Sequence, residues 1–497
     1  MAEKYILTYD MGTTMIKLVL FDQEGKIIHN DSFNLDNYNI GGHQVQQAEN
    51  WWDGITTLTH RLADSGINLN SISAIVSTGQ MEDCLLLDLK GDILTEVLLY
   101  SDGRASDEQK YIIDRIGEGD LYDILGNNFD PLMSINKYLW LKKHRKEAFA
   151  KHAYLILGAK DYLNFKLTGY NVTDYTNAST TGFMDLKKGK WSSRIIAELQ
   201  IDPKNLPQID KATSIIGKVK KEVAEELKIP SGIPVLNGSG DVGASTLGAG
   251  AWREGDIYCY LGTTGWLAAP VGGLTDNPNV FTLSNIDGEG YILAGAILNA
   301  GKPYDWYLTN ILGEYANKAL EKKDYLNNEE KIKDLNAAEK GVFFLPFING
   351  ERSPIKVKEN NGAFLGLGPE TDKHLLLRAV LEGVSFSLKH NLDELKGLGN
   401  SIRKLNLIGG GGKSKVWPQI LANILNLEVN VLDLGIGAPS MGTALMAYKA
   451  LGLLDNYSEF IEQFSVKKRF RPEKEAVEIY SQSFKYYLAY IDKLYNH

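Results

Sequence analysis

The chain opens with short apolar runs separated by turn residues. Residues 5–9, 16–22 and 27–33 are rich in apolar and aromatic side chains, and the polar, glycine-containing segments 10–14 and 23–26 separate them. Runs of this length between turn segments are typical of β-strands. The pattern therefore predicts a meander of three strands at the start of the chain.

A helical spacing of apolar residues follows the meander. Trp52, Ile55 and Leu58 fall three positions apart within residues 48–65, which predicts one buried helix face. Residues 473–495 have a similar spacing and are predicted to form a second amphipathic helix. The apolar positions of this second helix are Val477, Tyr480, Phe484, Tyr487, Ile491 and Leu494.

The opening pattern occurs twice in the chain. An apolar run at 256–260, a Gly-Thr-Thr turn at 261–265 and another apolar run at 266–270 repeat the arrangement of residues 5–20. Two halves that begin alike indicate a duplicated α/β lobe. A cleft between two such lobes is a favoured place for a small-ligand site.

Several further elements complete the predicted lobes. Strands are expected at 72–76, 85–88, 405–408 and 429–432, and helices at 414–426 and 439–450. The helix at 439–450 carries the small residues Gly442, Ala444 and Ala447, which allow another backbone to approach closely.

Composition excludes several classes of protein. The 497 residues include 53 Lys and Arg against 62 Asp and Glu, a net charge of −9, which disfavours general binding of nucleic acid or anionic membranes. The two cysteines form neither a disulfide framework nor a zinc motif. No apolar run reaches membrane-spanning length, and the first residues lack a signal-peptide pattern, so we expect a cytoplasmic protein. The 49 glycines are more than the average composition of a globular protein predicts, and this excess is informative.

The two Gly-Thr-Thr turns carry chemistry suited to a polyphosphate. Thr13 and Thr14 offer amide and hydroxyl donors, Lys17 offers positive charge, and Asp10 could hold Mg²⁺ through water. The second turn repeats the donors with Gly262, Thr263 and Thr264. Two such hairpins could hold one polyphosphate from both lobes.

Two other glycine clusters resemble nucleotide motifs only in part. Residues 238–243 match G-x-G-x-x-G, but the acidic residue that a dinucleotide fold needs about 20 positions later is missing. Asp241 within this segment is better suited to act as a base in a cleft. Residues 409–414 are not a P-loop, because Leu407 stands where its first glycine is required, yet a glycine-rich strand-to-helix turn still offers free amides to a nucleotide.

Together these motifs resemble the FGGY family of carbohydrate kinases, within the actin–hexokinase–Hsp70 superfamily. The resemblance covers nearly the whole chain, including segments 134–141 and 362–383, which resemble the two family signatures. It implies an α/β fold of two duplicated actin-like ATPase (ribonuclease H-like) lobes with an interdomain cleft, divided into residues 1–246 and 247–497. The implied reaction is ATP-dependent phosphorylation of a sugar hydroxyl.

The resemblance also implies roles for particular residues. Asp241 is the expected general base, and Asp10 and Asp241 are the expected ligands of Mg²⁺. The expected ATP-binding residues are Thr13, Thr14, Lys17, Gly262, Thr263, Thr264, Gly410, Gly411 and Ser414. The expected sugar-binding residues are Gln80, Met81, Glu82, Asp102, Arg104 and Asp241.

The sugar is the least determined part of this hypothesis. This chain has Glu82 where xylulose kinases of the family typically have the His of Gly-Gln-Met-His, whereas glycerol kinases carry Glu at that place. Glycerol kinases also carry Tyr where this chain has Leu132, so Leu132 argues against glycerol. A carboxylate at Glu82 would repel a sugar acid such as gluconate, which favours a neutral ketopentose such as D-xylulose. Another ketose, a polyol or gluconate remain alternatives, as do a nucleotide-gated clamp and a sugar sensor without catalysis. Family members are often homodimers, so a homodimer is also considered.

Overall fold

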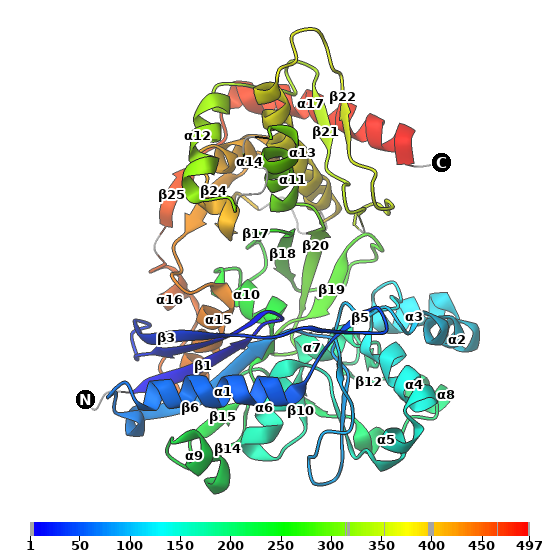
Figure 1. Ribbon diagram of the computed structural model, residues 1–497, viewed down its shortest axis with the longest axis vertical. Coiled ribbons are helices and arrows are strands. Elements are labelled where there is room, and N and C mark those ends of the chain that lie inside the picture. Colours follow the sequence, from blue (N-terminus) through cyan, green and yellow to red (C-terminus); the bar gives the residue numbers. More distant parts are fainter. Residues whose placement is uncertain are drawn as a thin grey trace.

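The computed structural model describes residues 4–313, 315, 319–351, 353–395, 402–464 and 466–495. Within these ranges the chain forms two α/β lobes, one above the other in Figure 1. Each lobe is built on a seven-stranded sheet. This confirms the predicted α/β class and the pair of lobes.

The first sheet has the order β14-β15-β6-β1-β2-β3, and β16 also pairs with β6. The strands β1 and β2 are antiparallel, with Asp10 opposite Lys17, and β1 and β6 are parallel, with Asp10 opposite Thr78. The strand bounds are β1 Tyr5–Met11, β2 Met15–Phe21, β3 Ile27–Asn34, β6 Ile72–Gly79, β14 Ile215–Lys218, β15 Pro234–Leu236 and β16 Ser239–Gly240. The parallel strands bring the carboxyl ends of β1, β6 and β16 to one edge.

The second sheet repeats this arrangement. Its order is β19-β20-β18-β17-β23-β24-β25, and the β17–β18 hairpin is antiparallel while β17 and β23 are parallel. The strand bounds are β17 Tyr258–Leu261, β18 Gly265–Val271, β19 Phe281–Ser284, β20 Tyr291–Ile297, β23 Lys404–Ile408, β24 Glu428–Leu432 and β25 Val466–Phe470. Strands β20-β18-β17-β23-β24-β25 match β3-β2-β1-β6-β15-β14 in order and in the direction of every pair. The duplication predicted from the two hairpins is therefore a duplication of whole sheets.

Two helices lie between the sheets. In Figure 1, α10 (Asp241–Gly248) and α15 (Ala438–Ala450) lie side by side at the centre of the molecule. Both contribute to the apolar cluster on one face of the first sheet, with Ala244 and Leu247 from α10 and Ala444 and Leu445 from α15. The close packing expected from the small residues of the 439–450 segment is confirmed, because Gly442 leaves no room for a side chain beside the carbonyl oxygen of Ala244.

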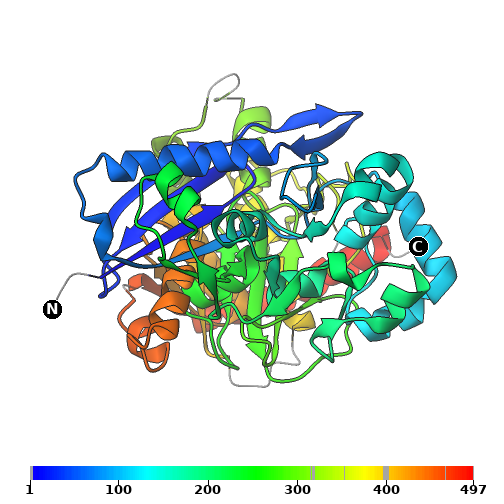
Figure 2. The same cartoon turned by 90° about the horizontal axis from the view of Figure 1, so that it is seen from below.

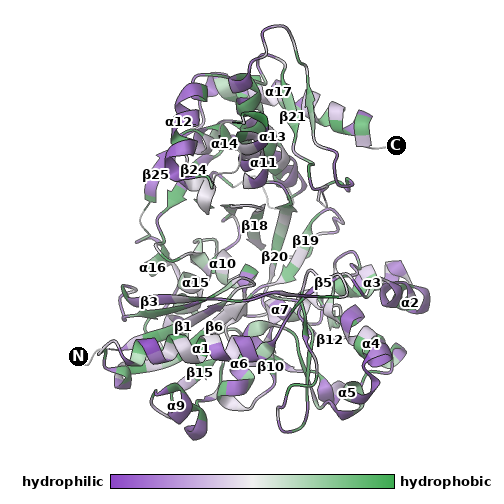
Figure 3. Cartoon of the chain, in the orientation of Figure 1, coloured by the Kyte–Doolittle hydropathy of each residue, from purple (hydrophilic) through white to green (hydrophobic). Residues whose placement is uncertain are grey.

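Helices cover the outer faces of both sheets (Figure 1). Apolar residues of β1 alternate between two core clusters, one on each face of the sheet, and so the whole strand is buried. Figure 3 shows α12 largely hydrophilic and α13 largely hydrophobic, in keeping with the buried position of α13. The covering helices are α1 Ala48–Ala63, α6 Ala159–Thr168 and α9 Lys221–Leu227 in the first lobe, and α11 Gly301–Trp306, α12 Lys322–Ile332, α13 Lys373–Glu394, α14 Trp417–Leu425 and α17 Lys474–Tyr495 in the second.

A helical region lies beside the first sheet and has its own apolar cluster. Its cyan and teal ribbon is on the right in both Figure 1 and Figure 2. Its helices are α2 Ser106–Ile116, α3 Glu118–Leu125, α4 Ser134–His144, α5 Lys146–Lys151 and α8 Ser193–Glu198. The short helix α7 Tyr175–Thr180 lies nearer the centre (Figure 1) and packs against β16 and β19. The remaining short elements of the fold are β4 Tyr38–Ile40, β5 His43–Gln46, β7 Leu85–Leu87, β8 Val97–Leu98, β9 Tyr154–Ile156, β10 Val172–Asp174, β11 Met184–Asp185, β12 Lys190–Trp191, β13 Gln208–Asp210, β21 Phe343–Leu345, β22 Ala363–Leu365 and α16 Ser458–Ile461.

Some element boundaries differ from the predictions. Asp10 lies within β1, not in the turn, because β1 continues to Met11 alongside β6. The helix predicted from residue 414 begins at Trp417, since residues 410–413 form a 3₁₀ turn. Leu494, expected on the buried face of α17, is 45% exposed. None of the helices in the described ranges has the length and apolar character that crossing a membrane requires.

Candidate active site

A cavity of about 940 Å³ lies where the two lobes meet. Its wall includes the end of β1, the turn after β6, the start of α10 and the hairpin of the second lobe. The parallel pairing of β1, β6 and β16 explains why their carboxyl ends open into one space. At that edge Met11 is opposite Gly79 and Gly240 is also opposite Gly79.

Asp241 is the first residue of α10 and lines this cavity. Burial raises its pKa from the ordinary 3.8 to about 7, the carboxylate of Asp10 adds to the shift, and the amide of Val242 partly opposes it. The preceding turn requires glycine at residue 238, where φ is +69° and a Cβ would lie 1.8 Å from the carbonyl oxygen of Ser77. A carboxyl with a pKa near neutral pH, facing a cavity, is suited to general acid–base chemistry.

Asp10 and Lys17 form a cross-strand pair at the cavity wall. The Lys17 ammonium lies 3.4 Å from Oδ2 of Asp10, and Asp10 is buried whereas Lys17 is half-exposed. Burial raises the pKa of Asp10, and Lys17 opposes the shift. Lys17 thus projects positive charge into the cavity beside two carboxyl groups.

Glu82 lines the cavity from the turn that follows β6. Its backbone is left-handed, with φ of +62°, which side chains other than Gly, Asn and Asp seldom adopt. Burial raises the pKa of Glu82 to about 7; the ammonium of Lys137 opposes the shift and Asp130 adds to it. The buried Lys137 donates to the carbonyl oxygens of Glu82 (2.8 Å) and Leu132 (2.5 Å), so it ties the turn at Glu82 to the segment before α4.

Asp102 and Arg104 form a pair with each other. The guanidinium Nε of Arg104 donates to both carboxylate oxygens of Asp102, at 3.0 and 2.8 Å, and its side chain packs 4.9 Å from the ring centre of Trp140. His43 lies 3.4 Å from Asp102. Neither Asp102 nor Arg104 is among the residues that line the cavity, whereas Tyr100 of the same segment is.

A second cavity, of about 530 Å³, adjoins the first within the second lobe. Gly410, Lys413 and Tyr260 line both cavities, so one elongated ligand can extend from one into the other. Tyr260 stacks on Trp266, its cross-strand partner, with ring centres 4.1 Å apart. Ser414, at the edge of the second cavity, accepts hydrogen bonds from the amides of residues 416 and 417 and so begins α14.

The structure brings most of the predicted site residues to these two cavities. The first cavity is lined by Asp10, Thr13, Lys17, Gln80, Met81, Glu82, Asp241, Thr264 and Gly410, and the second by Gly262, Thr263, Gly410, Gly411 and Ser414. Those that do not line either cavity are Thr14, Asp102 and Arg104.

Some lining residues were not among the sequence predictions. The Tyr260–Trp266 pair could have been found, because both side chains flank the second Gly-Thr-Thr turn in the sequence. Asp305 and Tyr325 line the second cavity and share a 2.7 Å hydrogen bond, yet they lie on separate segments without a recognisable motif. Thr180 lines the first cavity beside Glu82 and was missed for the same reason, because it lies on a distant segment without a recognisable motif.

A duplicated α/β fold with an acidic cavity beside a glycine-lined cavity is the arrangement expected of a nucleotide-dependent phosphotransferase. Models of the N-terminal and C-terminal domains of the FGGY family of carbohydrate kinases match residues 5–248 and 257–451. The chain belongs to this family and is an ATP-dependent carbohydrate kinase, with a sugar and ATP as its substrates. The resemblance and the two-lobed fold predicted from the sequence are confirmed.

Individual relatives differ in the sugar that their names specify. The chain is 27% identical to the xylulose kinase of Bacillus subtilis, over 97% of this chain and 96% of the relative. The crystal structures of a xylulose kinase and of a gluconate kinase, both from Lactobacillus acidophilus, each match with a TM-score of 0.90 and 27% identity, covering 99% of this chain and 98% of theirs. Overall similarity therefore does not distinguish the two sugars.

Proposed function

We propose that this kinase phosphorylates a neutral ketopentose such as D-xylulose, with Asp241 as the general base. The observation that carries the proposal is that the carboxyl groups of Asp10, Glu82 and Asp241 all line one cavity. Burial raises the pKa of Asp10 and of Glu82, because a negative charge is costly in this cavity. A neutral acceptor enters such a site without the repulsion that a sugar carboxylate would meet.

Each lobe contributes one part of the proposed reaction. Residues 1–246 hold the sugar and the base, and residues 247–497 hold the adenosine end of the nucleotide. Gln80, Met81 and Glu82 contact the sugar, while the Asp102–Arg104 pair supports the segment that presents Tyr100. The phosphates lie between the two hairpins. Their partners are Thr13, Lys17, Gly262, Thr263 and Thr264, with Gly410, Gly411 and Ser414 toward the nucleoside.

In the proposed step, Asp241 accepts the proton of a sugar hydroxyl as that oxygen bonds to the γ-phosphorus. The bond between the γ-phosphorus and the β-phosphate oxygen breaks, and ADP leaves. General-base assistance of this kind contributes a factor of about 10²–10⁴ to the rate. Lys17 balances charge on the phosphates, and burial of the cavity limits the access of competing water.

The carboxylates of Asp10 and Asp241 fit a magnesium site. Mg²⁺ is usually held by one or two carboxylates together with substrate phosphates and water, and these two side chains line the same cavity. No group of three metal-ligating side chains occurs in the part of the chain that the structure describes, which agrees with a site completed by the nucleotide. When bound, Mg²⁺ would neutralise phosphate charge.

Gluconate is the second candidate acceptor, because the chain resembles a gluconate kinase structure as closely as a xylulose kinase structure. The test is ADP release by the purified full chain with MgATP and a panel of D-xylulose, D-ribulose, xylitol, glycerol and gluconate. The proposal expects the highest kcat/KM for a neutral ketopentose. A preference for gluconate would contradict it, and slow ADP release independent of any sugar would indicate a nucleotide-gated clamp.

A further inference from the structure

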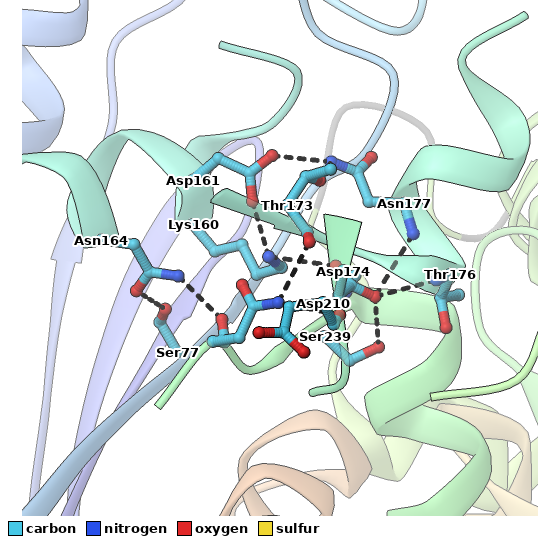
Figure 4. Close-up of polar contacts among 12 residues, drawn as sticks. Ser77, Lys160, Asp161, Asn164, Thr173, Asp174, Thr176, Asn177, Asp210 and Ser239 are labelled. Carbon is cyan, nitrogen blue, oxygen red and sulfur yellow. Dashed lines mark hydrogen bonds and ion pairs between the residues drawn. The ribbon is translucent and has the colours of Figure 1, made fainter. Parts of the chain in front are cut away.

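A buried ion cluster lies behind the cavity wall. Nζ of Lys160 is 2.6 Å from Oδ1 of Asp161 and 3.0 Å from Oδ1 of Asp174, and all three side chains are at most 1% exposed (Figure 4). Taking three charges out of water is costly, so such a cluster persists only when hydrogen bonds complete it. The destinations of those hydrogen bonds indicate what the cluster holds in place.

Asp174 reaches the turn that carries Asp241. Its Oδ1 accepts a hydrogen bond from the amide of Gly240 at 3.1 Å, and its Oδ2 accepts one from the hydroxyl of Ser239 at 3.1 Å. Gly240 immediately precedes Asp241, so these contacts fix the backbone from which the Asp241 carboxylate projects. The same turn packs on Met81, since a Cβ at Gly240 would lie 2.5 Å from the Met81 sulfur.

Asn177 reaches the turn that carries Glu82. Its side-chain amide donates to Oδ2 of Asp161 at 3.0 Å, which orients its Oδ1 to accept the amide hydrogen of Glu82 at 3.3 Å. Asp174 immediately precedes α7, and its Oδ2 accepts a hydrogen bond from the backbone N–H of Asn177 at 3.3 Å. One cluster therefore contacts both functional turns, from side chains that do not themselves line the cavity.

We propose that Asp174 and Asn177 are positioning residues for the phosphoryl transfer. Asp174 sets the direction of the Asp241 carboxylate, Asn177 sets the left-handed turn at Glu82, and Lys160 with Asp161 locks the two together. The inference rests on the proposed function, because it requires Asp241 as the base and Glu82 as a sugar ligand. A role in capping α7 alone would not require the contacts to Ser239, Gly240 and the Glu82 amide.

The test compares two variants by steady-state kinetics on the full chain with the preferred sugar. Asp174→Asn keeps a good helix-capping side chain but removes one acceptor oxygen from the Gly240 contact. Because small misplacements of a catalytic group are costly, we expect kcat to fall about 10–100-fold with the sugar KM nearly unchanged. Asn177→Ala leaves the Glu82 amide without its acceptor and is expected to raise the sugar KM about tenfold, with a smaller effect on kcat.

The matched control is Asp185→Asn. Asp185 is also a buried aspartate of the first lobe, but its carboxylate is bonded to Lys188 and not to the network around Asp241. We expect native kcat and KM from this control. Thermal unfolding of every variant separates loss of fold from loss of positioning.

The kinetic split decides the proposal. A native kcat in Asp174→Asn would overturn it. So would changes in kcat and KM that run in parallel in both variants and scale with their loss of melting temperature. If Asp174→Asn does not fold, Ser239→Ala decides: a kcat lowered about 3–10-fold supports positioning, and a native kcat overturns it. Full activity of Asp241→Asn would instead defeat the proposed function, whereas an inactive Asp241→Asn beside a fully active Asp174→Asn would defeat this inference alone.

Discussion

Gly248 of α10 and Gly442 of α15 face each other where the two central helices cross. A Cβ on Gly248 would lie 1.9 Å from the carbonyl oxygen of Ala438, and a Cβ on Gly442 would lie 1.9 Å from that of Ala244. The backbones are therefore in direct contact. Since α10 begins with Asp241, this crossing helps to fix the helix that carries the proposed base.

Gly442→Ala is expected to destabilise the protein. The added methyl group must separate α10 from α15, and overpacking of this kind costs about 1–3 kcal/mol of unfolding free energy. Chemical denaturation of the variant and the wild type measures the difference. Gly119→Ala in α3 is the control, because a Cβ there meets nothing within 4 Å and should raise stability slightly. Equal stability of Gly442→Ala and the wild type would contradict the packing described.

Asp241→Asn is expected to stabilise the nucleotide-free protein above neutral pH. The folded chain holds the Asp241 proton up to about pH 7, whereas the unfolded chain releases it near the ordinary pKa of 3.8. The folded state thus binds more protons in that interval, and the free energy of unfolding falls as pH rises through it. Asparagine removes this penalty, by about 1–4 kcal/mol at pH 8.

Thermal melts of Asp241→Asn and the wild type between pH 5 and pH 8, in chelator and without nucleotide, test this expectation. The melting temperature of the variant should exceed that of the wild type at pH 8, and the gap should shrink toward pH 5. A gap of opposite sign, or one that does not change with pH, would show that burial does not raise the pKa of Asp241.

Glu82 is expected to control which sugars are accepted. Glu82→Gln keeps the size of the side chain and removes its charge, so gluconate should gain in kcat/KM relative to D-xylulose. Removing the negative charge of Glu82 from close to the gluconate carboxylate should change the ratio of the two kcat/KM values by about tenfold or more. Glu82→His tests the side chain typical of xylulose kinases. An unchanged order of preference across the sugar panel in both variants would mean that Glu82 does not set specificity.

Gly410→Val is expected to block the nucleotide without harming the fold. A Cβ at Gly410 meets no atom within 4 Å, and the residue lines both cavities, so a larger side chain would enter the space proposed for ATP. We expect the Kd of MgATP, measured by calorimetry, to rise by about tenfold or more, because a loss of about 1.4 kcal/mol of binding free energy raises Kd tenfold. Gly368→Val, at another position with open space, is the control. Native nucleotide affinity in Gly410→Val would place ATP elsewhere.

The sequence predicted the parts of the site that follow from local patterns. The two hairpins, the strand before Gln80 and the glycine-rich turns are each recognisable from a few consecutive residues, and the repetition of the hairpin revealed the duplicated lobes. The end of β1 differs from the prediction because Asp10 and Gly12, which flank Met11, are both residues typical of turns. Parallel pairing with β6 keeps both Asp10 and Met11 in the strand.

What could not be predicted depends on contacts between distant segments. Lys160, Asp174 and Asn177 are ordinary residues in the sequence, and only the fold brings them to the turns at Glu82 and Gly240. Asp102 and Arg104 illustrate the same limit in the other direction. Their residue types suit sugar binding, yet in the structure they bond to each other. The turn that brings the amide and Nε of Arg104 to the Asp102 carboxylate could not be predicted from the residue types.

The measurement that tests the central claim most directly is phosphoryl transfer by Asp241→Asn. Sugar-dependent ADP release is measured for the variant and the wild type with saturating D-xylulose and MgATP, alongside the Kd of MgATP for each. If Asp241 is the general base, kcat falls by about 10²–10⁴ while nucleotide binding is retained. Turnover close to the wild-type rate would contradict the assignment of Asp241 as the base.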